Sequence, residues 1–80
     1  MKVEQTNYKS KLAQYLRKKR IAEDASQEFF AHQFSMNRTY YGKVERGENS
    51  IGLDKLQNIA NVLQLPLSEL FRQIEEINQQ

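Results

Sequence analysis

The segment spanning residues 37–45 carries polar side chains whose chemistry suits the edges of DNA bases. They supply a guanidinium that can bind guanine through two hydrogen bonds, a hydroxyl, an aromatic surface for a thymine methyl group and an ammonium. The four residues are Arg38, Thr39, Tyr40 and Lys43. We predict that they contact DNA bases, and an ordinary solvated helical face is the alternative.

The residues that catalysis or metal binding would need are scarce. The chain has no cysteine and one histidine, His32, which has no second metal ligand three or four residues further along. Ser26, Ser68 and His32 do not match a hydrolase triad in motif or spacing. We therefore expect no enzyme activity, no metal site and no cofactor.

Charge is distributed unevenly along the 80 residues, whose net charge is +2. Residues 1–46 hold ten Lys and Arg against five Asp and Glu, whereas residues 47–80 hold two against five. The first part suits a polyanion such as nucleic acid, although a basic patch supports only sequence-independent binding. Because no apolar stretch is long enough to span a bilayer and no signal-peptide core is present, we expect a cytoplasmic protein without membrane contact.

Hydrophobic periodicity and capping residues predict five short helices. Ser26 fits an N-cap and Gly47 a left-handed C-cap. The expected helices run from about Asn7 to Arg20, Ser26 to Phe34, Asn37 to Glu45, Leu53 to Leu63, and Pro66 to Ile77. The predicted fold class is all-α, a compact five-helix bundle in one domain over residues 1–80. Its core covers about residues 7–71, and residues 72–80 form the end of the fifth helix and a tail.

The second and third of these helices are separated by about three residues, which is the arrangement of a helix-turn-helix. Because two such helices cross steeply, their apolar residues must meet at the inner corner. The residues available there are Phe30, Phe34, Met36, Tyr41 and Val44. Ala31 is small at the point where the third helix must approach closely. The polar residues of segment 37–45 then face outward.

Three blocks of the chain resemble the phage-repressor/Cro-like (Xre-type) helix-turn-helix family. They are SQEFFA (residues 26–31), NRTYYGKVERG (37–47) and LDKLQNIANVLQLPLSELF (53–71), and their spacing is in register with the family. The resemblance implies a bundle of the lambda-repressor-like DNA-binding type. Within the family, the run from Arg38 to Tyr40 in so short a chain most resembles the controller proteins of restriction–modification systems.

The resemblance also implies roles outside the base-contacting set. Gln27 matches a family position that contacts the sugar–phosphate backbone, and a helix N-terminus itself favours phosphate; a plain capping role is the alternative. Arg20 and Glu45 are implied to form a structural ion pair between the first and third helices. From the helix ends and the loop after Gly47, we predict further phosphate contacts by Asn37, Arg46, Asn49 and Ser50.

Three residues depart from the family pattern. Ser35 occupies the turn position that usually holds glycine, where a left-handed backbone costs a non-glycine residue roughly 1 kcal/mol. Tyr41 replaces a more common Ile or Val, so its hydroxyl must reach the surface or find a partner. Gly42 lies inside the third helix, at a cost of about 1 kcal/mol relative to alanine.

An apolar stripe continues past the family block into the C-terminal segment through Ile74 and Ile77. These residues either close the core of the monomer or form a dimer interface. Since small cores often need the support of an oligomer, we predict the interface.

Together these features predict a sequence-specific transcriptional regulator of double-stranded DNA. We expect a homodimer on an inverted-repeat operator, with helix 37–45 in the major groove and no small-molecule ligand. The alternative is an antitoxin-like or other protein-interaction module with the same fold, whose C-terminal apolar stripe contacts a partner protein.

Overall fold

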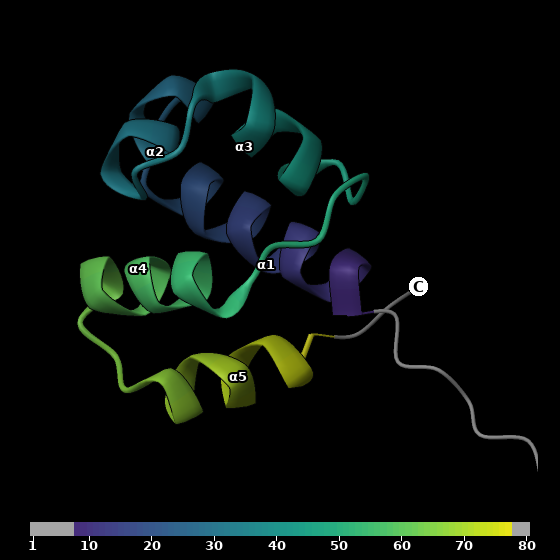
Figure 1. Ribbon diagram of the computed structural model, residues 1–80, viewed down its shortest axis with the longest axis vertical. Helices are drawn as coiled ribbons and strands as arrows, with labels where there is room; N and C mark the ends of the chain where they lie inside the picture. Colours follow the sequence, from purple (N-terminus) through teal and green to yellow (C-terminus); the bar gives the residue numbers. More distant parts are fainter. Residues whose placement is uncertain (1–7, 78–80) are drawn as a thin grey trace, which may run out of the picture.

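Five helices and their connecting turns form the part of the chain that the computed structural model describes, residues 8–77. They are α1 (Tyr8–Ala22), α2 (Gln27–Gln33), α3 (Arg38–Glu45), α4 (Leu53–Leu63) and α5 (Leu67–Glu75), as shown in Figure 1. The predicted all-α, five-helix fold is confirmed. The expected helix start at Asn7 and the tail at residues 78–80 lie outside the described residues.

Side-chain caps begin the two helices of the helix-turn-helix. The Ser26 hydroxyl accepts a hydrogen bond from the Phe29 N–H at 3.0 Å, as its predicted capping role requires. The Asn37 side-chain oxygen accepts one from the Tyr40 N–H at 2.7 Å. Each bond satisfies a donor that the first turn of a helix leaves open. Asn37 is therefore the cap of α3, one residue before the helix begins.

Left-handed residues end the same two helices. Ser35 follows α2 with a φ of 59°, and the Met36 N–H returns to the Ala31 carbonyl at 2.8 Å. Gly47 follows α3 with a φ of 77°, as predicted for a C-cap glycine. Both are Schellman turns, which satisfy the last carbonyls of a helix and reverse the chain sharply. The turn between α2 and α3 is thus fixed by backbone bonds.

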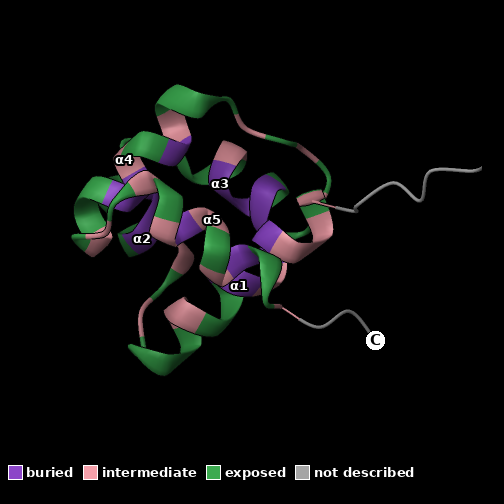
Figure 2. Cartoon of the chain, turned by 90° about the horizontal axis from the view of Figure 1, so that it is seen from below, coloured by how far each residue is buried: buried purple, intermediate pink, exposed green. Residues whose placement is uncertain are grey.

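Apolar side chains from all five helices meet in one core, and buried positions line the inner sides of the helices in Figure 2. The inner corner of the helix-turn-helix is aromatic: the rings of Phe30 and Phe34 lie 5.1 Å apart, and each lies 6.3 Å from Tyr41. All five predicted corner residues are buried. This packing fixes α3 against α2 by one side and leaves its other side outward.

The first helix is the support for the rest of the fold. Helix α1 packs against both α3 and α5, while α2 packs against α3 and α4 against α5. Figure 1 shows α2 and α3 at one end of the molecule and the α4–α5 pair at the other. Within residues 8–77, none of the helices has the length and apolar character needed to cross a membrane.

The predicted dimer contact by Ile74 is wrong. Its side chain is 0% exposed and belongs to the core of the single chain, together with Leu70. The reason is that α5 folds back against α1, so its apolar stripe is covered one turn further than the sequence indicated. Ile77 lies just beyond the end of α5 and remains partly exposed.

Candidate nucleic-acid interface

Helix α3 has a buried side and an exposed side, and three of the four predicted base-contacting residues lie on the exposed side. Tyr41 and Val44 are each 0% exposed, whereas Arg38, Thr39 and Lys43 are exposed. In Figure 1, α3 runs along the edge of the molecule, away from α4 and α5. A row of cationic and hydroxyl side chains is therefore presented outward on a helix that is held firmly from behind.

Tyr40 occupies an intermediate place between this exposed row and the core. It is partly buried and packs against the core cluster, and its hydroxyl donates to the carbonyl of Ser50 at 3.4 Å. This contact joins α3 to the loop before α4. Tyr40 can therefore offer a base only part of its ring and the hydroxyl, and it also steadies the loop that carries Asn49 and Ser50.

The ion pair predicted between Arg20 and Glu45 is present in the structure. Arg20 donates to both carboxylate oxygens of Glu45, each at 2.8 Å, and also to the Ala25 carbonyl at 3.0 Å. The side chains are 18% and 2% exposed, so the carboxylate is removed from solvent. The pair joins α1 to the last turn of α3, and Glu45 has no surface left with which to contact DNA.

The charge of Glu45 is stabilised by its neighbours. Burial by itself would raise the pKa of this carboxyl, but hydrogen bonds from Arg20 and Gln27 outweigh burial and hold the pKa below its ordinary value. Glu45 is therefore ionised at neutral pH, and the charges of the pair are matched within the fold.

Gln27 is the first residue of α2, and its side chain faces α3. The Gln27 amide donates to the Glu45 carboxylate at 3.0 Å. One of its two side-chain N–H groups is thus occupied inside the protein. Gln27 therefore links the ion pair to the N-terminus of α2.

The hydroxyl of Tyr41 does not behave as the sequence indicated. It neither reaches the surface nor finds a hydrogen-bond partner among residues 8–77. Burial, followed by the nearby Glu45 carboxylate, raises the pKa of Tyr41 well above its ordinary value. The ring fills the corner between α2 and α3, and this packing leaves the buried hydroxyl near the Arg20–Glu45 pair without a hydrogen bond, despite the cost.

Close packing explains why glycine stands at position 42 inside α3, which the sequence did not show. A Cβ atom at this position would lie 3.1 Å from the Arg46 guanidinium nitrogen Nη1 and 3.7 Å from the side-chain oxygen of Gln27. The first separation is tighter than ordinary contact, so a side chain here would push Arg46 away. Glycine keeps the Arg46 side chain close to the helix, at the edge of the α3 surface.

The loop after α3 carries the remaining predicted phosphate contacts. Arg46 is the C-cap of α3, and its guanidinium binds the Glu48 carboxylate at 2.8 Å. Asn49 is partly exposed and Ser50 is exposed. Glu48 was not among the predicted site residues; an acidic residue two positions after Arg46, across a C-cap glycine, was the available signal.

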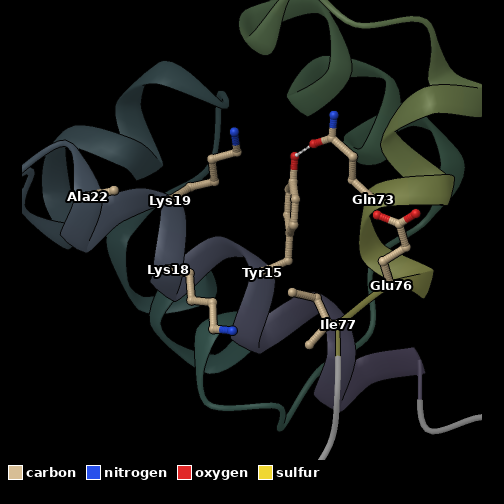
Figure 3. Close-up of a pocket in the computed structure, with 7 residues that line it drawn as sticks. All are labelled: Tyr15, Lys18, Lys19, Ala22, Gln73, Glu76 and Ile77. Carbon is tan, nitrogen blue, oxygen red and sulfur yellow. Dashed lines mark hydrogen bonds between the residues drawn. The ribbon is translucent and has the colours of Figure 1, made fainter.

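A hollow of about 390 Å³ lies between α1 and the end of α5, and Ile77 lines it. Figure 3 shows the Tyr15 hydroxyl pointing across the hollow at Gln73, to whose side-chain oxygen it donates at 2.6 Å. The other lining residues are Lys18, Lys19, Ala22 and Glu76. We call this surface the α1–α5 hollow. It combines an apolar floor with two lysines and a carboxylate at its rim.

No metal site competes with this interpretation. Among residues 8–77, no three His, Asp or Glu side chains are grouped so that they could hold a metal ion. The polar groups that the fold gathers are instead donors and cations on α3 and its two flanking turns.

Comparison with known proteins agrees with this arrangement. A family profile described as helix-turn-helix matches residues 16–70. A curated relative, the control protein C.MunI from a Mycoplasma species, is 45% identical over 53 residues, which cover 66% of this chain and 72% of the relative. The family match takes in both helices of the motif, α4 and the first turn of α5. The chain therefore belongs to the Xre-like helix-turn-helix family of DNA-binding regulators.

Proposed function

We propose that the chain is a controller-type transcriptional regulator that binds an inverted-repeat operator as a homodimer. The observation that carries this proposal is α3, whose exposed Arg38, Thr39 and Lys43 are presented by a helix with a fully buried inner side. A helix of this kind fits the major groove, where base pairs differ in their donor and acceptor patterns. The name of the relative C.MunI, a control protein, supports the controller role.

The residues of the interface divide by the part of DNA that each can reach. Arg38 starts α3 and reads guanine; Thr39, Tyr40 and Lys43 contact neighbouring bases. A rim of residues at helix ends and in the following loop contacts phosphates, which orients the protein without reading sequence. The rim consists of Gln27, Asn37, Arg46, Asn49 and Ser50.

Dimerisation uses the α1–α5 hollow and Ile77. Ile77 and Ala22 give the surface an apolar part, while Lys18 and Lys19 on α1 face Glu76, the C-cap of α5, whose carboxylate is also bound by Arg72. In a two-fold arrangement the lysines of one copy can meet the carboxylate of the other, which makes the surface self-complementary. Two copies would set their α3 helices about 34 Å apart, one turn of DNA.

Selection of binding sites from random duplex DNA tests the proposal. We expect enrichment of an inverted repeat whose half-site centres lie about one helical turn apart. A matched selection with the Arg38→Ala variant should lose the preference at one base pair in each half-site. Enrichment of a single half-site would contradict the dimer, and no enrichment of any sequence would contradict the regulator.

A further inference from the structure

The carboxylate of Glu48 lies among the cations of the proposed DNA-binding surface. Its two oxygens accept from Arg46 Nε at 2.8 Å and from Arg46 Nη2 at 3.4 Å. The side chains of Arg46 and Glu48 are 54% and 53% exposed, so the pair is on the surface and open to an approaching molecule. It differs in this respect from the enclosed pair of Arg20 and Glu45.

A backbone hydrogen bond positions Glu48 beside the end of α3. The left-handed turn at Gly47 brings the Glu48 N–H to the Lys43 carbonyl at 2.8 Å. Glu48 is thereby fixed against the last turn of α3, and the absence of a side chain at Gly42 lets the Arg46 guanidinium lie alongside. The hydrogen bond from Arg46, together with the charges of Arg46 and Lys43, lowers the pKa of Glu48, so it is ionised at neutral pH.

A carboxylate that takes two hydrogen bonds from a guanidinium uses the same donors that would bind two oxygens of a phosphate. The Nε–Nη2 edge of Arg46 cannot bind both at once, while Nη1 lies on the Gly42 side of the guanidinium. We infer that Glu48 occupies the phosphate-binding position of Arg46 in the free protein, so that DNA must displace it and Glu48 limits DNA affinity. This inference rests on the proposed phosphate contact by Arg46.

The strength of the pair sets the size of the effect. Exposed ion pairs contribute up to about 1 kcal/mol, so the carboxylate is displaced readily and does not block binding. We expect Glu48→Gln to raise affinity for random-sequence duplex about twofold to fivefold at low salt. In this variant no carboxylate neutralises the charge of Arg46 before DNA binds. The salt dependence of binding should therefore become steeper by up to roughly one phosphate contact.

A double-mutant cycle on the intact chain separates this competition from a general effect of charge. The proteins are the wild type, Glu48→Gln, Arg46→Ala and the double variant, titrated with a random-sequence duplex at several salt concentrations. Glu23→Gln is the matched control, because it removes one exposed carboxylate at the turn after α1 and leaves α3 unchanged. Circular dichroism and thermal melting of each variant verify the fold.

The expected result is a gain of affinity in Glu48→Gln that is absent from Glu23→Gln and largely lost when Arg46 is already alanine. Equal gains in Glu48→Gln and Glu23→Gln, or the same gain without Arg46, would overturn the competition. Weaker binding by Arg46→Ala with no change in Glu48→Gln would overturn it as well, leaving the proposed phosphate contact intact. If Arg46→Ala binds as tightly as the wild type, the phosphate contact itself fails and the inference fails with it.

Discussion

The guanidinium of Arg20 holds both carboxylate oxygens of Glu45, each at 2.8 Å, and so joins the supporting helix α1 to the last turn of α3. Glu45 also accepts from Gln27 at the start of α2. One carboxylate therefore ties together three helices at the back of the proposed DNA-binding surface. The orientation of the exposed row on α3 depends on this buried junction.

Removing one partner of this pair should destabilise the fold strongly. We expect Glu45→Ala to lower the free energy of unfolding by about 3 kcal/mol, because it leaves Arg20 partly buried and unpaired. Replacing Arg20 and Glu45 together should cost less than the sum of the single replacements. Urea unfolding of the four proteins measures the coupling energy, and a value indistinguishable from zero would exclude a structural role for the pair.

The same carboxylate should make stability depend on pH. Burial alone would raise the pKa of Glu45, yet hydrogen bonds from Arg20 and Gln27 hold it below the ordinary 4.5. The unfolded chain therefore takes up this proton at a higher pH than the folded protein. The stabilisation by Glu45 should be complete above about pH 4.5 and disappear as the pH falls through the folded pKa.

Urea unfolding of wild type and Glu45→Gln across the acidic range checks this expectation. Hydrogen bonds from Arg72 and Gln73 lower the pKa of Glu69 to about 2, which gives acid sensitivity of the same sign in both proteins. The difference between the two curves isolates Glu45 and should shrink as the pH falls. A difference that stays constant from neutral to acidic pH would contradict the assignment.

Arg38 should determine base preference. Arg38→Ala is expected to weaken operator binding by about 1–3 kcal/mol, because a two-hydrogen-bond contact with guanine is lost, and to relax preference at one base pair per half-site. Fluorescence anisotropy on the selected operator and its single-base variants measures both effects. Arg17→Ala, which removes an exposed arginine on α1, is the control. Equal losses on all sequences would move Arg38 to the phosphate-contacting group.

Ile77 should hold the proposed dimer together. Ile77→Asp is expected to fold, sediment as a monomer and lose operator affinity by roughly 100-fold or more, since the two sites would no longer be linked. Val62→Asp changes another exposed apolar residue, on α4, and should remain dimeric. Ile74→Asp should instead unfold, because it buries a charge in the core. A folded Ile77→Asp dimer would place the interface elsewhere.

The turn at Ser35 should be open to stabilisation. Ser35→Gly is expected to raise the free energy of unfolding by about 0.5–1 kcal/mol, because the φ of 59° costs serine more than glycine. Gln33→Gly, two residues earlier at the last residue of α2, should lower it by up to about 1 kcal/mol. Thermal melting compares the two variants. A loss of stability in both would mean that the serine side chain contributes more than the backbone strain costs.

Features that depend on neighbouring residues could be predicted from the amino-acid sequence. Ser26 and Gly47 specify helix ends through hydrogen bonds that span a few positions, and the apolar spacing of residues 27–46 specifies the helix-turn-helix corner. The outward row of Arg38, Thr39 and Lys43 followed from the same periodicity. Such features could be predicted because local geometry fixes them before the chain is packed.

The contacts that each helix face makes could not be predicted in this way, because they depend on how the helices pack. Ile74 continues the same stripe whether it meets α1 or a second copy, and the packing of α5 against α1 buries it in the monomer. The unpartnered hydroxyl of Tyr41 likewise depends on how closely α2 and α3 approach. Glu48 reaches Arg46 because the turn at Gly47 reverses the chain, whereas sequence spacing leaves the direction of its side chain undefined. Periodicity gives the angular position of a residue on its own helix. The residues that it contacts on other helices are set by the angles between the helices, which depend on the packing of the whole core.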